Sequence, residues 1–335
     1  MAGVAGWGAF IPRYRIKAAE FRSALGAFAA PGVAEKAVAD VDDDSVTMAT
    51  SAAIAALRHS GAVPASIRLI SLASSSLPYE QKHQVGTIGL AVGAPADCLG
   101  LQFAGSSKAG TEALLASLSL MQRTGGCALV AAGDQRCSSI YSPLEHGAGA
   151  AGCALVLGSH DVVAELEGSA HFMDDRLGQR FRPSGRNEVQ DIDVKEYSEQ
   201  AVVTATRGAA MRLFQETGLK ASDFRHLCFT ELDGKMARLT ATRIGASEES
   251  ITTTNLAPRL GDTGVCGVLL GFISALENSD PGDRVLLISY GEGGGADALA
   301  FRVCGKKQAG NLGEQIADCE YIDFVRYLKL RGKLA

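Results

Sequence analysis

Runs of apolar residues, each about as long as one strand, recur along the chain between longer segments with helical character. The runs expected to form buried strands cover residues 67–73, 98–103, 127–132, 151–157, 226–230 and 285–289. Unbroken apolar stretches of this length are typical of strands that are covered on both faces. The helical segments cover residues 46–59, 85–92, 111–121, 194–217, 235–244 and 264–278. The alternation predicts an α/β protein.

The second half of the chain repeats the order of elements in the first half. Residues 127–157 and 284–303 each contain a strand, a glycine-rich loop and a second strand. Each half also has a buried helix that follows a turn of small residues. Two similar α/β halves, residues 1–160 and 161–335, are therefore expected. Neither half carries a G-x-G-x-x-G after its first strand or a P-loop, so a nucleotide site is not expected.

The segment 101–118 contains the most distinctive candidate for chemistry. Its apolar strand breaks into small residues, and an apolar helix follows from Thr111. Ser106 and Ser107 stand where that helix begins. Free N–H groups and the positive end of a helix dipole favour an anion or a nucleophile at such a place. The segment is either a corner that carries a nucleophile or a tight turn before a core helix.

Composition narrows the class of protein. The chain has 335 residues, 47% of them hydrophobic, a net charge of −5, and no block of basic residues that would suggest nucleic acid. Its eight cysteines include no C-x-x-C pair and lie mostly in apolar runs, which is typical of buried thiols in a reducing compartment. No secretory signal and no apolar run of about 18–20 residues is seen. We therefore expect a soluble, cytoplasmic protein that binds neither nucleic acid nor a membrane.

Several motifs resemble the archaeal-type 3-hydroxy-3-methylglutaryl-CoA synthase family along the whole chain. They include QFAGSSKAGTEALL at 102–115, LGDTGVCGVLLGF at 260–272, PGDRVLLISYGEGGGADALAF at 281–301 and YIDFVRYLKLRGKL at 321–334. The corner at 103–111 is also similar to the synthase-like subunit of a bacterial complex that acetylates phloroglucinols. The resemblance implies a thiolase-like five-layered α/β/α/β/α fold with two halves related by a pseudo-twofold axis.

The same resemblance implies that the family's catalytic residues have changed in this chain. The family uses a cysteine for the acyl group, a glutamate for proton transfer and a histidine for the thioester oxygen. Ser107, Ser75 and Thr230 stand at these positions, and Asp262 replaces an asparagine. Gly105 and Ser106 make the corner about two residues longer than in the family. A serine is a weak nucleophile unless a base lies within hydrogen-bond reach.

Other residues near these positions are candidate substitutes, although each also has an ordinary structural explanation. Glu80 and His83 lie beside the position of the lost glutamate, and Glu231 and Asp233 flank that of the lost histidine. Asp262 and His146 belong to loops that the resemblance places at the cavity. A core position is expected for Cys266, and ordinary loop or strand positions for His160 and His171. Arg13, Arg15 and Lys17 form either a solvated basic edge or a contact for a CoA phosphate.

These observations leave two main hypotheses about function. The first is a non-catalytic or divergent subunit of an acyltransferase or condensing complex that acts on acyl-CoA thioesters. The second is an active acyl-thioester enzyme that uses non-standard residues in the same cavity, such as Ser107, Asp262, His146 or Glu80. Acyl-CoA or CoA is expected as a substrate, with no tightly bound cofactor and no metal. The resemblance also implies a homodimer or higher oligomer, with a thiolase and a small OB-fold/zinc-ribbon protein as partners.

Overall fold

The computed structural model describes residues 2–176, 180–191, 195–230 and 234–334. Its main sheet has nine strands, in two sets that follow the two halves of the chain. The first set has the order β5-β4-β6-β7-β1, and the second has the order β8-β11-β10-β9. Their bounds are β1 Gly3–Phe10, β4 Ile67–Ser74, β5 Leu99–Ala104, β6 Cys127–Gln135, β7 Ala150–Gly158, β8 Ala164–Phe172, β9 His226–Phe229, β10 Arg284–Gly291 and β11 Gly295–Val303. Only a short pairing of β1 with β8 joins the two sets.

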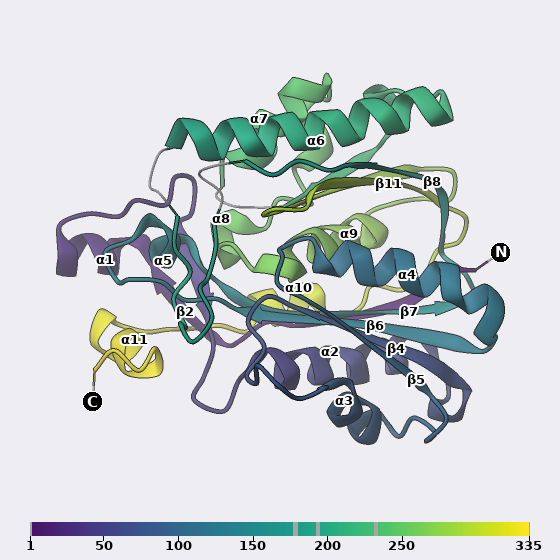
Figure 1. The fold of residues 1–335 in the computed structure, drawn as a ribbon, viewed down its shortest axis with the longest axis horizontal. Helices are drawn as coiled ribbons and strands as arrows, with labels where there is room; N and C mark the ends of the chain where they lie inside the picture. Colours follow the sequence, from purple (N-terminus) through teal and green to yellow (C-terminus); the bar gives the residue numbers. More distant parts are fainter. Residues whose placement is uncertain (1, 177–179, 192–194, 231–233, 335) are drawn as a thin grey trace.

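Helices cover both sets of strands and separate them, which gives five layers (Figure 1). The central layer contains α4 (Ala109–Thr124) and α9 (Gly267–Glu277). One outer layer contains α2 (Ser45–Ser60) and α3 (Val85–Val92), and the other contains α6 (Lys195–Thr217) and α7 (Met236–Ile244). The predicted α/β/α/β/α layering is confirmed. No helix of the described part of the chain is both long and apolar enough to span a bilayer.

Helix α2 lies almost in contact with the backbone of the first set of strands. A Cβ atom on Gly133 of β6 would lie 1.9 Å from the Ser45 carbonyl oxygen, and one on Gly152 of β7 would lie 2.3 Å from that of Met48. The Asp44 side chain accepts from the N–H groups of residues 46 and 47, and Gly61 ends the helix in a left-handed conformation. Glycine in the strands therefore fixes how closely this well-capped helix approaches.

The beginnings of α4 and α9 meet at the centre of the molecule. A Cβ atom on Gly110 of α4 would lie 2.6 Å from the carbonyl oxygen of Val265, in the 3-10 turn Gly264–Cys266 that precedes α9. Gly264 has φ +61°, and a Cβ there would lie 2.0 Å from Oδ2 of Asp134. This close approach brings together the ends of β6, α4 and α9, which come from both halves.

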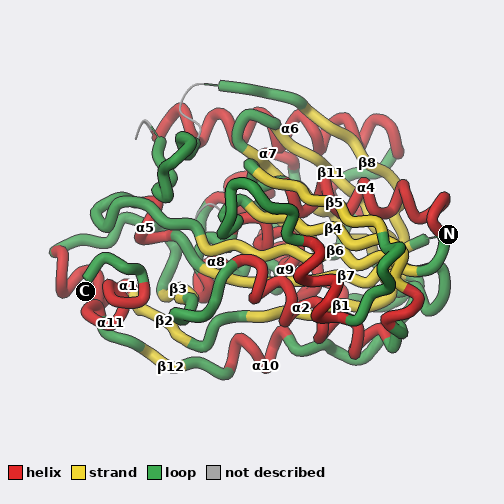
Figure 2. The backbone as a smooth tube through the Cα atoms, turned by 60° about the horizontal axis from the view of Figure 1, so that its bottom comes forward, coloured by secondary structure: helices red, strands yellow, loops and turns green. Residues whose placement is uncertain are grey.

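The chain also forms a small peripheral subdomain whose three strands the apolar pattern did not predict. A three-stranded sheet has the order β12-β2-β3, with β2 Tyr14–Lys17, β3 Glu35–Val38 and β12 Glu320–Tyr321. It lies beside α1 (Ala18–Leu25) and α11 (Phe324–Leu330), at the end of the molecule where the C-terminus lies (Figure 2). The remaining short helices are α5 Pro143–Gly147, α8 Ala257–Leu260 and α10 Leu312–Ala317, with 3-10 turns at Pro64–Ser66, Ala221–Asp223 and Glu248–Ile251. The last residues thus return to the first half of the chain.

Candidate active site

Ser107 lies at the start of α4 and is bonded to a carboxylate from the other half of the chain. Its side-chain Oγ donates to Oε2 of Glu292 at 2.9 Å, and its N–H lies 3.3 Å from the same oxygen. Glu292 belongs to the glycine-rich loop between β10 and β11. A Cβ on the neighbouring Gly291 would lie 2.1 Å from Oγ of Ser106, so this loop approaches the corner closely only because glycine is there. Ser107 is 3% exposed, and its hydroxyl already has a base within hydrogen-bond reach.

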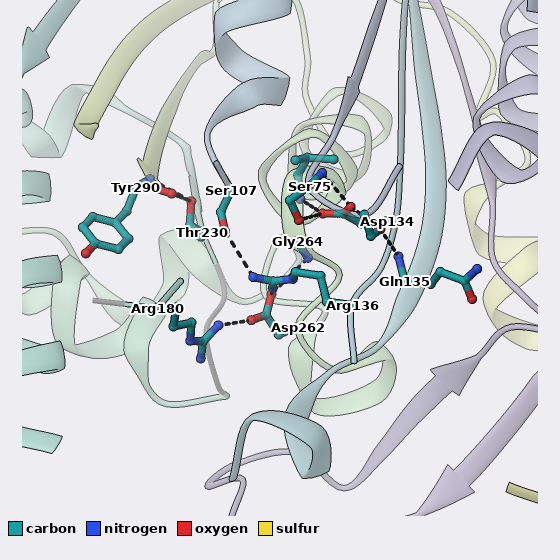
Figure 3. A network of polar contacts seen from close by, with 12 residues as sticks. Ser75, Ser107, Asp134, Gln135, Arg136, Arg180, Thr230, Asp262, Gly264 and Tyr290 are labelled. Atoms are coloured by element: carbon teal, nitrogen blue, oxygen red, sulfur yellow. Dashed lines mark hydrogen bonds and ion pairs between the residues drawn. The ribbon is translucent and has the colours of Figure 1, made fainter. Parts of the chain in front are cut away.

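Arg136 approaches the same hydroxyl from the end of β6. Its Nη1 donates to Oγ of Ser107 at 3.2 Å, and the guanidinium forms an ion pair with Asp262 (Figure 3). Burial by itself favours the neutral form of Arg136, but Asp262, Asp134 and Glu292 together raise its pKa above the ordinary value. The arginine is therefore charged and directs that charge at the serine oxygen.

Asp262 is held between two arginines. Besides its ion pair with Arg136, it accepts from Nη1 of Arg180 at 2.6 Å and from the Gly264 N–H at 3.0 Å. Burial by itself would raise the pKa of the Asp262 carboxyl, but the two guanidinium groups hold it below the ordinary value. The Asp262 carboxylate is thus ionised and fully engaged, which makes it a poor general base and a strong anchor for the arginines.

Ser75 faces Asp134, a carboxylate with no exposed surface at the end of β6. Oδ2 of Asp134 accepts from Oγ of Ser75 at 2.7 Å and from the Val265 N–H at 3.0 Å. Oδ1 accepts from the Ser75 N–H at 2.8 Å and from the hydroxyls of Ser74 and Ser76 at 3.1 and 2.7 Å. Asp134 therefore joins the serine loop to the turn before α9, and Ser75 has an anchoring role there.

A cavity of about 110 Å³ opens in front of these groups. Its lining includes Ser75, Ser107, Arg136, Arg180, Arg182 and Glu292. A smaller cavity behind Arg136 also reaches Asp262 and Cys137. Burial raises the pKa of the Cys137 thiol, and its Sγ lies 3.1 Å from the carbonyl oxygen of Asn187. Neither lining includes a histidine among the described residues, so no thiol–imidazole pair forms there.

Thr230 lies at the end of β9 and is bonded to the strand that leads to Glu292. Its Oγ1 accepts from the Tyr290 N–H at 2.8 Å, and its N–H donates to the Ile288 carbonyl oxygen at 3.1 Å. Thr230 is 3% exposed and is absent from the cavity lining. The structure thus places Thr230 where it fixes the backbone two residues before Glu292.

His146 lies among aromatic side chains and not on the cavity. Its ring stacks on that of Phe28 with centroids 5.5 Å apart, and the Phe21 ring is 5.0 Å away. Nδ1 accepts from the Ala29 N–H at 2.9 Å, and Nε2 lies 3.0 Å from the Ile140 carbonyl oxygen. Burial lowers the pKa of His146, in keeping with a neutral ring whose two nitrogens both hold the backbone.

The candidates Glu80 and His83, and the residues expected at ordinary positions, also lie apart from the cavity. Glu80 is exposed, and its Oε1 accepts from the Gly185 N–H at 3.1 Å. His83 and His160 are exposed, and His171 lies 2.9 Å from Asp297. Cys266 is fully buried, which confirms the core position expected for it. Glu231 and Asp233 lie outside the described residues.

The prediction that Arg15 belongs to a solvated basic edge or a phosphate contact is wrong. Its side chain is 1% exposed and donates to the carbonyl oxygens of Pro12 and Tyr14. Arg15 lies on β2, where alternate side chains point to opposite faces. Arg13 and Lys17 are exposed: Arg13 lies 3.5 Å from Asp318, and Lys17 lies over the Tyr321 ring.

The sequence analysis missed Glu292, Arg136, Asp134 and Arg180. A signal for two of them was present, because Asp134 and Arg136 are charged residues at the end of an otherwise apolar strand. Such residues are rarely buried unless they are paired. Glu292 and Arg180 carry no comparable signal, since their contacts come from distant segments of the chain.

A second buried network connects the C-terminal helix to Arg136. The Glu145 carboxylate accepts from Nε of Arg331 at 2.9 Å, from the Ser138 N–H at 2.6 Å and from the Tyr327 hydroxyl. Nη2 of Arg331 also donates to the carbonyl oxygen of Arg136 at 2.7 Å. The C-terminal tail therefore fixes the backbone that carries the arginine of the site.

Lys36 is buried in this network and gives a prediction for the pH dependence of stability. Burial lowers the pKa of Lys36 to about 7, although Glu145 acts in the opposite direction. The unfolded chain keeps this proton up to a pH near the ordinary lysine pKa, so unfolding takes up a proton between these values. The free energy of unfolding should therefore gain up to roughly 1.4 kcal/mol per pH unit from this group between pH 7.5 and 9.5.

Lys36→Met should remove this contribution, because the variant has no proton to exchange at that position. Urea unfolding of the wild type and of Lys36→Met at pH 7.5, 8.5 and 9.5 measures the difference in slope. Lys17→Met, a substitution of an exposed lysine on the adjacent strand, is the control and should keep the wild-type slope. Parallel curves for the wild type and Lys36→Met would contradict the prediction.

Comparison with known proteins places the chain in a family. The hydroxymethylglutaryl-CoA synthase of Methanopyrus kandleri is 33% identical over 353 residues, which cover 99% of this chain and 97% of that protein. The hydroxymethylglutaryl-CoA synthase of Thermococcus gammatolerans is 31% identical over 344 residues, covering 99% and 96%. The chain belongs to the hydroxymethylglutaryl-CoA synthase family.

Comparison with solved structures shows that this chain shares its fold with proteins of much lower sequence identity. MvaS in complex with 3-hydroxy-3-methylglutaryl coenzyme A has a TM-score of 0.86 at 18% identity, covering 98% of this chain and 91% of that chain. The HMG synthase of the curacin biosynthetic pathway, in complex with holo donor-ACP, has a TM-score of 0.84 at 20% identity, covering 98% and 88%. The family of 3-oxoacyl-[acyl-carrier-protein] synthase III C-terminal domains matches residues 214–303. This member of the hydroxymethylglutaryl-CoA synthase family thus has a thiolase-like fold.

Proposed function

We propose that this protein is an active acyl-CoA-dependent enzyme of its family in which Ser107 accepts the acyl group. The observation that carries the proposal is the 2.9 Å hydrogen bond from the Ser107 hydroxyl to Glu292 at the edge of a cavity. A serine becomes an effective nucleophile when a base is within such reach. Full-length relatives that are named as hydroxymethylglutaryl-CoA synthases support acyl-CoA as the substrate class.

The reaction at Ser107 would be an acyl transfer from a thioester. Oγ forms a bond to the thioester carbonyl carbon, and the carbon–sulfur bond breaks. The proton of the hydroxyl passes to the Glu292 carboxylate and from there to the CoA sulfur, so the products are an acyl-serine ester and free CoA. The Arg136 guanidinium, 3.2 Å from Oγ, favours the negative charge that develops during the attack.

Intact-protein mass spectrometry after incubation with acetyl-CoA tests this proposal. The wild type should gain one acetyl group on Ser107, and Ser107→Ala should gain none. Glu292→Gln should lower the rate of acylation by roughly 100-fold or more, since it removes the base but keeps the size of the side chain. Ser119→Ala is the matched control, because Ser119 is an exposed serine on the same helix and should leave the rate unchanged. An unmodified wild-type Ser107 would reject the proposal.

A second candidate function, a non-catalytic subunit of a condensing complex, is favoured by a different observation. The side chains of Arg136 and Arg180 line the cavity, and both are held in ion pairs with Asp262. On this alternative, acyl turnover needs a partner with its own catalytic residues, for which a thiolase and an OB-fold/zinc-ribbon protein are the candidates. The predicted dimer remains a prediction, and β5 is an edge strand, as pairing of two copies along it would require.

A further inference from the structure

Arginine side chains dominate the charge of the cavity in front of Ser107. Arg136, Arg180 and Arg182 line it, whereas Glu292 is the only carboxylate among the described residues of its lining. Asp262 pairs with Arg136 and Arg180, and Asp134 and Glu292 also act on Arg136, so these two arginines are largely compensated. Arg182 has no such carboxylate partner among the described residues, and an uncompensated guanidinium at a partly enclosed surface favours an anionic ligand.

Arg182 is the arginine of this lining whose N–H donors are mostly not engaged by the described residues. Its Nη2 donates to the Ser75 carbonyl oxygen at 3.0 Å, which holds the guanidinium beside the serine loop. In the described part of the chain it forms no ion pair with a carboxylate. A guanidinium has five N–H donors, so most of those on Arg182 remain available at the cavity.

Hydrogen bonds to the backbone fix the segment that carries Arg180 and Arg182 against the site. Phe181 and Gln190 exchange two hydrogen bonds of 2.8 Å, which makes a hairpin of the residues between them. The Val189 N–H donates to the Cys137 carbonyl oxygen at 2.8 Å, and the Ser138 hydroxyl donates to the Val189 carbonyl oxygen at 2.7 Å. This hairpin therefore holds its arginines in place on the loop that follows Arg136.

From this arrangement we propose that the acyl group transferred to Ser107 ends in a carboxylate, so that the donor is a short dicarboxylic acid monothioester. The inference rests on the proposed function and names the substrate class of the same site. Guanidinium and carboxylate match in a two-point geometry that a neutral acyl group cannot use. A cavity of about 110 Å³ has room for a short acyl group only. Arg182 is then a binding residue for the distal carboxylate, and Arg180 lines the same cavity.

Malonyl-CoA and propionyl-CoA form a matched pair of probes, because a carboxylate in one replaces a methyl group in the other. The wild type should form the malonyl-serine at least roughly tenfold faster than the propionyl-serine, as a charge-assisted hydrogen bond would give. Arg182→Ala should lower this ratio to about one. Arg182→Lys should give an intermediate ratio, since lysine keeps the positive charge but cannot bind a carboxylate through two parallel N–H donors. Arg186→Ala replaces an exposed arginine of the same hairpin that does not line the cavity, and it should keep the wild-type ratio. Equal rates in the wild type, or an unchanged ratio in Arg182→Ala, would overturn the inference.

Binding to Ser107→Ala separates this inference from the proposed function. Calorimetry should show tighter binding of malonyl-CoA than of propionyl-CoA to Ser107→Ala, and Arg182→Ala in that background should remove the difference. A preference in binding without acylation of wild-type Ser107 would uphold the anion site and reject the serine nucleophile. Acylation of wild-type Ser107 without any difference between malonyl-CoA and propionyl-CoA would uphold the serine nucleophile and reject the anion site.

Discussion

Replacing Asp134 with alanine is expected to lower the free energy of unfolding by about 3–5 kcal/mol. The carboxylate has no exposed surface and accepts five hydrogen bonds, from the loop of Ser74, Ser75 and Ser76 and from the Val265 N–H. Its loss leaves two N–H donors and three hydroxyls, all buried or partly buried, without their acceptor. It also removes a negative charge close to Arg136. Urea unfolding at constant pH measures the change.

Two further variants make the Asp134 prediction specific. Asp134→Asn keeps the size of the side chain and one acceptor oxygen, so it should lose less stability than Asp134→Ala. Asp97→Ala removes an exposed aspartate in the same half of the chain and should change the free energy of unfolding by less than about 0.5 kcal/mol. If Asp134→Ala and Asp97→Ala unfold at the same urea concentration, Asp134 does not join the elements as we describe.

Replacing Glu145 with alanine is expected to lower the free energy of unfolding by about 3–5 kcal/mol and to impair the site as well. The Glu145 and Arg331 side chains are 0% and 12% exposed, so the change leaves a buried guanidinium without its counter-ion. Lys36 also loses the nearby carboxylate charge that raises its pKa, although its Nζ keeps the hydrogen bond to the backbone carbonyl oxygen of residue 145. Because Arg331 also donates to the Arg136 carbonyl oxygen, acylation of Ser107 should slow down in the folded variant.

A matched pair on the same tail provides the control for Glu145. Glu320 and Arg326 lie 2.9 Å apart with side chains 40% and 45% exposed, so Glu320→Ala should cost less than about 1 kcal/mol. The double variant Glu145→Leu/Arg331→Leu should recover much of the loss, because a buried ion pair can be replaced by apolar groups when both partners go. Additive effects of the two single changes would contradict a direct coupling between Glu145 and Arg331.

The sequence was a reliable guide wherever a segment carries its own signal. The helix predicted at 85–92 is α3, and the strand predicted at 151–157 is the middle of β7. In contrast, β2, β3 and β12 are short strands: β2 pairs with β3, and β12 joins them only because the C-terminal tail returns to the first residues of the chain. No apolar run marks them, because their pairing and not their composition makes them strands.

The candidate site was predicted in part. The corner at Ser106 and Ser107 follows from the small residues before an apolar helix, and the cavity does lie there. The carboxylate that makes Ser107 a candidate nucleophile comes from Glu292, 185 residues further along the chain. His146 shows the opposite outcome. The resemblance placed it in a loop at the cavity, but it lies in α5, and both of its ring nitrogens are bonded to the backbone of residues 29 and 140.

The sequence by itself determined the α/β class, the positions of most core strands and helices, and the corner of small residues at the start of α4. These depend on local periodicity, on small residues and on overall content, all of which can be read along the chain. Only the tertiary structure decided which charges meet at Ser107, because Glu292, Arg136 and Arg180 come from three separate segments. Electrostatic interactions act over distances in space and not along the sequence, so the chemistry of the cavity appeared only when the two halves were packed together.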